Sequence, residues 1–125
     1  EDDKTFSDIW TEYNEDFTAF YDAVIKDMET YQNQKGIKPK PGKPDNFCPV
    51  SCVPWLSFTG YASDTYSDSP MLYPVVLFGR YYEKEGRTFL PLGAAFHHAA
   101  ADGYHSCRFL NEIQELAETF RLPRR

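Results

Sequence analysis

The sequence predicts an α+β fold with an antiparallel or mixed sheet, because helical and strand patterns occur in separate blocks along the chain. Apolar residues recur at three- and four-residue spacing near both ends, which is typical of amphipathic helices. Between these blocks lie β-prone runs separated by turn residues, without regularly intervening helices. With 125 residues, 42% of them hydrophobic, the chain is expected to form one folded domain over residues 1–125.

The two end blocks predict the helices. The first block, Phe6 to Tyr31, has the spacing of one or two helices, and Ser7 or Thr5 is expected to cap the start, since a hydroxyl accepts from free backbone N–H groups. Its large apolar residues are Phe6, Ile9, Trp10, Tyr13, Phe17, Phe20, Tyr21, Val24, Ile25, Met28 and Tyr31. The same spacing returns from Tyr104 to Phe120, which predicts the last helix.

The middle of the chain predicts a loop and three strands. The loop covers Gly36 to Asp45, where prolines remove backbone donors. A strand is expected within Phe47 to Phe58, interrupted by a proline. The apolar runs Leu72 to Tyr82 and Thr88 to Phe96 predict an antiparallel hairpin, in which Gly86 adopts the positive φ of a tight turn.

Charge and hydropathy exclude two broad classes of function. The formal charge of −6 disfavours non-specific nucleic-acid binding, which depends on Lys and Arg against phosphates. No apolar stretch approaches the roughly 20 residues of a membrane helix, and no leading segment resembles a signal peptide. A cytoplasmic protein without nucleic-acid or membrane partners is expected.

The cysteines are expected to be reduced thiols. Their number, three, is odd, and their density is too low for a disulfide scaffold. A zinc site built from Cys48, Cys52 and the histidine pair at 97 and 98 is the alternative. Adjacent histidines rarely both reach one ion, so we expect no metal.

The most informative stretch is His97-His98-Ala99-Ala100-Ala101-Asp102-Gly103, where a predicted strand leads into the last helix. An imidazole, with an unperturbed pKa of about 6.5, is suited to removing a proton at neutral pH. Gly103 permits a bend that exposes the preceding side chains. A pair of solvated or packed histidines is the alternative interpretation, and the complete His-His-x-x-x-Asp-Gly pattern favours the catalytic one.

This motif resembles the active-site signature of the CoA-dependent acyltransferase superfamily. Other segments resemble the chloramphenicol acetyltransferase family in particular, so that the resemblance spans essentially the whole chain. They are Thr5-Phe6-Ser7 with Trp10 and Tyr13, Val50 to Thr59 with Pro54-Trp55, Gly79 to Tyr82, Leu90-Pro91-Leu92, Gly103-Tyr104-His105, and Arg108 to Glu112. The resemblance implies a two-layer sandwich, with helices on one face of a mixed or antiparallel sheet, here without the family's N-terminal portion.

The resemblance also implies catalytic roles. His98 corresponds to the general base that removes the proton from an acceptor hydroxyl, whose oxygen then attacks the thioester of acetyl-CoA. Ser51 corresponds to a hydroxyl donor to the oxyanion, with an ordinary strand serine as the alternative. Asp102 corresponds to a structural aspartate paired with an arginine of the absent N-terminal portion, and it can also cap a helix. His97 is interpreted as structural.

Two further groups of residues correspond to binding positions. Tyr81, Arg80 and Trp55 resemble residues that contact acetyl-CoA, through an aromatic face for adenine and a cation for phosphate. Ordinary packing explains Trp55 and Tyr81 equally well. Phe6 and Tyr61 match aromatic positions of the family's acceptor pocket.

Four positions depart from the family pattern at the acceptor pocket. Lys38 replaces a phenylalanine, Ser63 and Thr65 replace aliphatic residues, and Leu77 replaces a threonine that holds an ordered water. Burying an unpartnered polar group costs about 1–3 kcal/mol, so the three polar replacements predict weak or no activity on chloramphenicol.

The resemblance implies a homotrimer, in which each active site lies between two subunits. A dihydrolipoyl acyltransferase core of the same superfamily is one alternative function. A non-catalytic interaction protein that keeps the trimeric fold is another.

Overall fold

The computed structural model describes residues 6–62 and 72–121, whose contacts form two compact units. The described residues before Asn46 make the first unit, and Asn46–Arg121 makes the second. The expectation of a single acetyltransferase-like domain over residues 1–125 stays a prediction.

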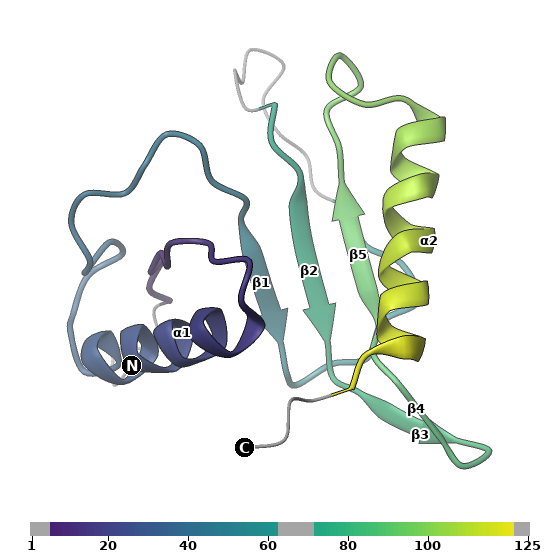
Figure 1. Ribbon diagram of the computed structural model, residues 1–125, viewed down its shortest axis with the longest axis horizontal. Coiled ribbons are helices and arrows are strands. Elements are labelled where there is room, and N and C mark those ends of the chain that lie inside the picture. The colour runs from purple at the N-terminus through teal and green to yellow at the C-terminus, as the bar shows by residue number, and fades with distance from the viewer. Residues whose placement is uncertain (1–5, 63–71, 122–125) are drawn as a thin grey trace. The chain divides into compact units, whose positions relative to one another are not determined.

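The second unit contains a mixed three-stranded sheet in the order β1-β2-β5 (Figure 1). β1 (Val50–Val53) runs parallel to β2 (Val75–Gly79), and β2 runs antiparallel to β5 (Leu92–Ala95). Branched and aromatic residues dominate β1 and β2, which suits a pleated, partly buried surface. The predicted α+β class with a mixed sheet is confirmed.

The predicted hairpin is present, but it is divided into two ladders. Beyond the pairing of β2 with β5, β3 (Tyr82–Lys84) and β4 (Arg87–Phe89) form a separate two-stranded sheet. Glu85 and Gly86 connect them with φ of 53° and 73°. Two central residues with positive φ match the twist of paired strands, so the conformation expected for Gly86 is confirmed.

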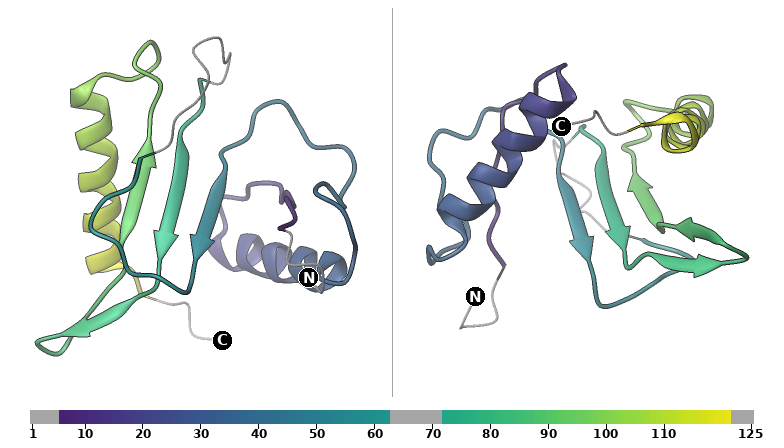
Figure 2. Two further views of the ribbon diagram at one scale, coloured as in Figure 1. Left: turned by 180° about the vertical axis from the view of Figure 1, so that it is seen from behind. Right: turned by 60° about the horizontal axis from the view of Figure 1, so that its bottom comes forward.

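The strand predicted within Phe47 to Phe58 is shorter than expected, since β1 ends at Val53, directly before Pro54. The chain then crosses one face of the sheet on its way to β2. The described part of this crossing, residues 54–62, passes behind β2 and β5 in Figure 1 and in front of them in Figure 2 (left). Parallel strands require such a crossover, because the chain must return to the same end of the sheet.

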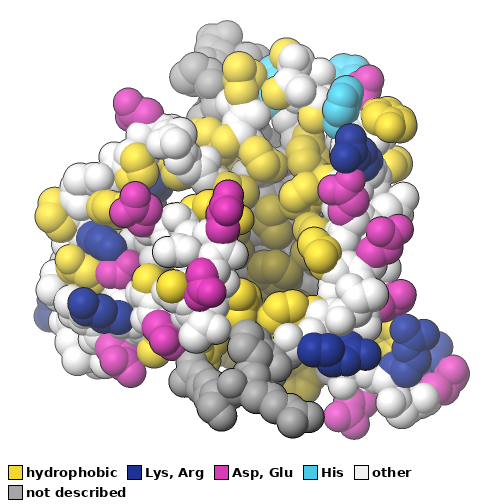
Figure 3. Space-filling model, viewed as in Figure 1, with side chains coloured by type: hydrophobic (Ala, Val, Ile, Leu, Met, Phe, Trp, Pro, Cys, Tyr) yellow, Lys and Arg dark blue, Asp and Glu magenta, His cyan; other side chains and the backbone are white. Residues whose placement is uncertain are grey.

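α2 (Gly103–Thr119) confirms the predicted last helix and lies beside β5 (Figures 1 and 2). The Phe109 ring contacts the Phe96 ring edge-on, with centroids 5.4 Å apart. Among the described apolar residues, Val76 on β2 is the one that is buried, at 5% exposed. Figure 3 shows hydrophobic side chains, in yellow, open to the surface over the strands. No helix among the described residues combines the length and apolarity needed to span a bilayer.

The first unit contains a single described helix, α1 (Phe17–Tyr31), which begins later than the sequence predicted. Asp16 caps it, and its carboxylate accepts from the Ala19 N–H at 2.7 Å. The predicted cap at Ser7 is wrong, because Ser7 lies well before the helix. Thr5 lies outside the described residues.

Residues 6–16 are not helical, and part of this segment bonds to the predicted loop at 36–45. Ser7 Oγ donates to the Gly36 carbonyl at 3.0 Å, and the Asp8 N–H donates to the Ile37 carbonyl at 2.7 Å. These contacts hold the segment beside the loop. The spacing of apolar residues was therefore a misleading signal over this segment.

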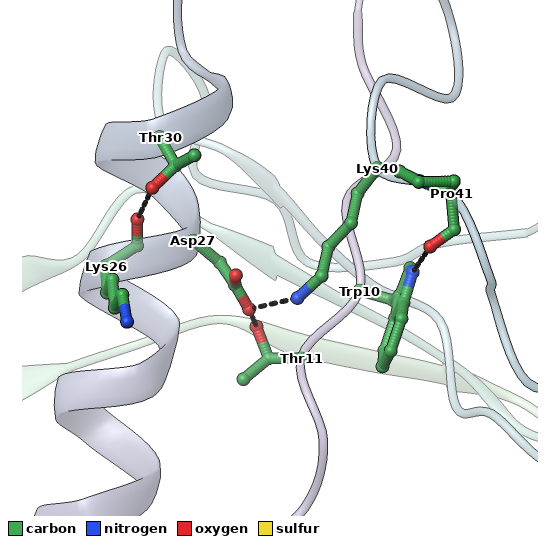
Figure 4. Close-up of polar contacts among 7 residues, drawn as sticks. All are labelled: Trp10, Thr11, Lys26, Asp27, Thr30, Lys40 and Pro41. Carbon is green, nitrogen blue, oxygen red and sulfur yellow. Dashed lines mark hydrogen bonds and ion pairs between the residues drawn. The ribbon is translucent and has the colours of Figure 1, made fainter.

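Lys40 connects the three segments of the first unit, which are residues 6–16, α1 and the loop at 36–45 (Figure 4). Its Nζ lies 2.7 Å from Asp27 Oδ2, which also accepts from Thr11 Oγ1 at 2.7 Å. The ammonium lies 4.3 Å from the Trp10 ring centroid, and Trp10 Nε1 donates to the Pro41 carbonyl at 3.0 Å. The Lys40 and Asp27 side chains are each 17% exposed, so water screens the pair only partly.

The hydrogen bond from Lys40 holds the pKa of Asp27 below its usual value, although burial opposes this. A carboxylate with a lowered pKa stabilises the folded state above its unfolded pKa, and this contribution is lost as the pH falls through the folded pKa. Asp27→Asn is therefore expected to cost about 1–2 kcal/mol at pH 7 and progressively less below about pH 4.

Chemical denaturation followed by Trp10 fluorescence, in a Trp55→Phe background, measures this difference. Glu29→Gln is the matched control, because it removes an exposed carboxylate from the same helix and should show no such pH dependence. An Asp27→Asn cost that stays constant from pH 7 to pH 3 would contradict the assignment.

Candidate active site

The register of the sheet aligns three residues across one face. Ser51 on β1 pairs with Leu77 on β2, and Leu77 pairs with Gly93 on β5. Directly paired residues point to the same face of a sheet, so the Ser51 and Leu77 side chains share a face, and a side chain at residue 93 would point to that face as well. We call this set the Ser51 row. Its outer strands are two interstrand spacings apart, about 10 Å.

Tyr61 lies on the face that carries the Ser51 row. A Cβ added at Gly93 would lie 2.9 Å from Tyr61 Cβ and 3.2 Å from Tyr61 Cδ1. Tyr61 therefore occupies the space into which a side chain at residue 93 would project. The structure thus brings together two predicted site residues, Ser51 and Tyr61, on one face.

The three residues predicted to contact acetyl-CoA lie at the ends of the parallel strands. Val53 and Gly79, the last residues of β1 and β2, pair with each other. Trp55 and Tyr81 therefore each lie two residues beyond the end of their strand, at the same edge of the sheet. Trp55 and Tyr81 are 76% and 65% exposed, which leaves their ring faces open.

Hydrogen bonds hold these two strand ends together. The Arg80 N–H donates to the Leu56 carbonyl at 2.6 Å, and Ser57 Oγ donates to the Arg80 carbonyl at 2.6 Å. The segment after β1 is therefore anchored to the segment after β2. This anchoring keeps Trp55 near Arg80 and Tyr81, as a shared ligand would require.

The His97–Asp102 turn lies where β5 leads into α2. The His97 carbonyl accepts from the Ala100 and Ala101 N–H groups at 2.8 and 3.1 Å, and the Ala99 N–H donates to His97 Nδ1 at 3.2 Å. His97 thus holds the turn together. Within residues 6–62 and 72–121, no hydrogen bond or ion pair reaches the exposed His98 ring. Figure 3 shows the histidines, in cyan, at the surface.

Asp102 ends the turn and caps α2. Its Oδ1 accepts from the His105 N–H at 3.1 Å and lies 2.6 Å from His105 Nδ1. These hydrogen bonds, the backbone one foremost, hold the pKa of Asp102 below its usual value. Among the described residues, His105 is the side chain in contact with this carboxylate, and sequence reasoning did not identify it. A weak signal was present, because a side chain at the third helical position is close enough to contact the cap residue, as it is in a capping box.

The remaining predicted site residues lie on other segments of the chain. His98 follows the end of β5, whereas Trp55 and Tyr81 follow the opposite ends of β1 and β2. Phe6 belongs to the first unit and is 76% exposed, and Lys38 is an exposed residue of the same unit. Ser63 and Thr65 lie outside the described residues.

The cysteines form no disulfide, and all three are exposed. Partial burial raises the pKa of the Cys48 thiol, which disfavours its thiolate form. No group of three or more His, Cys, Asp or Glu side chains in the described ranges is arranged to hold a metal ion.

Comparison with known proteins identifies the family. The sequence profile described as "Chloramphenicol acetyltransferase" matches residues 1–114, which include the whole His97–Asp102 turn. The chain belongs to the chloramphenicol acetyltransferase family.

Several relatives in this family are similar over almost all of the chain. The chloramphenicol acetyltransferase of Clostridium butyricum is 43% identical over 120 residues, which are 96% of this chain and 55% of that protein. That of Vibrio anguillarum is 42% identical over 120 residues, or 96% of this chain and 56% of that protein. The chain therefore spans about half the length of these relatives.

A solved structure supports the fold. A chain described as "chloramphenicol acetyltransferase" superposes with a TM-score of 0.68 and 21% sequence identity, covering 92% of this chain and 56% of that chain. At this identity the likeness shows the fold alone. It agrees with the mixed sheet and two helices described above.

Gly79 is a second position of close approach that sequence reasoning did not identify. A Cβ there would lie 2.9 Å from the Leu56 carbonyl oxygen and 2.9 Å from the Phe58 ring. Because the oxygen belongs to the backbone, Gly79→Ala must shift the segment after β1. We expect a loss of about 1–3 kcal/mol in the free energy of unfolding.

Trp55 reports this shift, because it lies next to Leu56. In a Trp10→Phe background, Gly79→Ala should change the Trp55 emission spectrum and its quenching by iodide. Gly60→Ala is the matched control, since a Cβ at Gly60 meets nothing within 4 Å. Equal stability and equal quenching in the two variants would contradict the close approach at Gly79.

Proposed function

We propose that the protein is an O-acetyltransferase that transfers the acetyl group of acetyl-CoA directly to an acceptor hydroxyl in a ternary complex. Membership of the chloramphenicol acetyltransferase family carries this proposal, because the match includes the turn on which the His98 ring is exposed. With acetyl-CoA as co-substrate, we expect the reaction in the cytoplasm.

His98 is the proposed general base. An imidazole without another hydrogen-bond partner can accept the proton of an acceptor hydroxyl within about 2.6–3.2 Å. The hydroxyl oxygen then attacks the carbonyl carbon of the thioester and forms a tetrahedral oxyanion. The hydrogen bonds made by His97 and Asp102 fix the backbone on both sides of His98, which favours one direction of approach.

Ser51 is the proposed donor to the oxyanion. Its hydroxyl is exposed on a strand, so it can be aimed without rearrangement at charge that develops only in the transition state. When the tetrahedral species collapses, the carbon–sulfur bond breaks. The CoA thiolate takes the proton from the His98 imidazolium, which restores the base and releases CoA and the acetyl ester.

The positions of Trp55, Arg80 and Tyr81 support a CoA molecule that extends along the strands. From Gly79 to Val75, which pairs with Ala95 shortly before the turn, β2 advances about 14 Å. An elongated cofactor can bridge this length, with its nucleotide against the aromatic and cationic side chains and its thioester toward a histidine.

We propose that the protein has weak or no activity on chloramphenicol and that another hydroxyl compound is its acceptor. Phe6 and Tyr61 are the aromatic side chains assigned to it, whereas Lys38, Ser63 and Thr65 add polar groups where the resemblance places apolar ones. An acceptor with polar substituents around its hydroxyl could pair with these groups. The aromatic ring of chloramphenicol would leave them without partners.

A homotrimer with shared active sites is part of the proposal. Within one chain, Ser51 lies in the middle of an outer strand and His98 lies beyond the end of the other outer strand. Exposed apolar side chains on the second unit, among them Val50, Leu110 and Leu116, are typical of surfaces that pack against protein. A cyclic assembly would place His98 of one subunit against Ser51 of the next.

His98→Ala is expected to lower kcat by about 10²–10⁴-fold, because it removes the group proposed to take the proton. Release of the CoA thiol, measured on the full-length protein with a panel of hydroxyl acceptors, tests this, and chloramphenicol should be among the poorest acceptors. His98→Ala should keep its affinity for acetyl-CoA in calorimetric titration. Binding of acetyl-CoA without turnover of any acceptor would favour a non-catalytic protein.

Shared sites predict complementation between two inactive variants. Ser51→Ala and His98→Ala subunits, co-expressed in equal amounts, should form trimers in which roughly one quarter of the sites carry both wild-type residues. Thiol release from purified mixed trimers should therefore exceed that of either variant alone. Activity of the mixture equal to the mean of the separate variants would mean that Ser51 and His98 act within one subunit.

A further inference from the structure

Gly93 allows Tyr61 to lie directly on the sheet. The three heavy atoms nearest to a Cβ built at Gly93 all belong to Tyr61, at 2.9 Å for Cβ, 3.2 Å for Cδ1 and 3.3 Å for Cγ. Carbon atoms in ordinary contact are about 3.5–4.0 Å apart. A single methyl group at residue 93 would therefore displace Tyr61 by roughly 0.5–1 Å.

This displacement could not be absorbed by the far end of the Tyr61 side chain. The closest atom is Tyr61 Cβ, which moves only with the backbone. Gly93 differs in this respect from Gly79, whose added Cβ would meet a backbone oxygen and a different ring. Substitution at Gly93 thus acts through Tyr61 in particular.

The position of Tyr61 matters because of what shares its face of the sheet. Leu77 lies between Ser51 and Gly93 in register, so Tyr61, which lies over Gly93, and Ser51 are on the same face of the sheet on either side of Leu77. The distance from Ser51 to Tyr61 across this face is set by two interstrand spacings and by the position of Tyr61. The sheet fixes the spacings, whereas the position of Tyr61 depends on the absence of a side chain at Gly93.

We propose that Gly93 is a specificity-determining residue, which sets the width of the acceptor site by seating Tyr61 against β5. The assignment rests on the proposed function, in which Ser51 serves the reaction centre and Tyr61 contacts the acceptor. The acceptor class that fits is an alcohol with polar substituents around its hydroxyl and one apolar portion, narrow enough to lie over Leu77 beside the Tyr61 ring. A larger residue at 93 would move the ring and select a differently shaped acceptor.

Gly93→Ala in the full-length protein tests this assignment. We expect the KM for the best acceptor of the wild type to rise by about tenfold, because a displacement near 1 Å at a binding group is costly. The KM for acetyl-CoA should change less than about twofold, since Trp55, Arg80 and Tyr81 lie at the strand ends. Gly60→Ala, in the same crossing segment and with open space around it, should change neither value.

A second pair of variants tests the contact without relying on turnover. Tyr61→Gly removes Tyr61 Cβ, so Gly93→Ala should lower Tm in the wild-type background and leave it unchanged in the Tyr61→Gly background. If Gly93→Ala alone does not fold, the double variant should recover folded protein. Equal Tm losses in both backgrounds, or no recovery, would overturn the contact on which the assignment depends.

The outcomes separate this assignment from the proposed function. If the wild type turns over an acceptor and Gly93→Ala leaves the acceptor KM unchanged, the assignment alone is overturned. An equal rise in the KM for the acceptor and for acetyl-CoA overturns it as well. Lack of turnover of every acceptor by the wild type overturns the proposed function and the assignment with it. A selective rise in acceptor KM, together with the Tyr61-dependent loss of Tm, supports both.

Discussion

The pairing of β2 with two neighbours of opposite direction is the constraint on which the candidate site depends. The parallel ladder with β1 sets Ser51 opposite Leu77, and the antiparallel ladder with β5 sets Leu77 opposite Gly93. Because side chains alternate between faces, a slip of one residue in either ladder would turn Ser51, or the position of Gly93 against which Tyr61 lies, to the other face. The same register aligns the ends of β1 and β2, so Trp55 and Tyr81 lie at the same edge of the sheet.

Features that depend on local chemistry could be predicted from the sequence. Gly86 follows Glu85 in a two-residue connection, and the positive φ needed there is a property of those residues. The last helix has a cap at Asp102 and apolar spacing to its end, so its bounds differ little from the prediction. The motif that contains His98 is contiguous, and its placement between a strand and a helix could be predicted without knowledge of distant contacts.

Features that depend on distant contacts could not be predicted in this way. Residues 6–16 have the apolar spacing of a helix, yet their backbone and side chains bind the segment at 36–41, which is proline-rich and cannot supply a strand pattern. Tyr61 and Gly93 are 32 positions apart, and a lone glycine in a strand does not indicate which residue fills its space. Tertiary contact decides both cases, and propensity carries no information about it.

Leu77 determines the character of the surface between Ser51 and Tyr61. The resemblance places a water-binding threonine at this position, whereas a leucine side chain has no hydrogen-bonding atom. An ordered water needs about two to four polar partners, so the centre of the Ser51 row cannot hold one through residue 77. An acceptor that covers Leu77 consequently gains by burying apolar surface there, and in the proposed reaction its hydroxyl is recognised elsewhere, by His98. Binding selectivity and proton removal are then carried by different elements, the sheet face and the turn, so a change in acceptor preference need not alter the base.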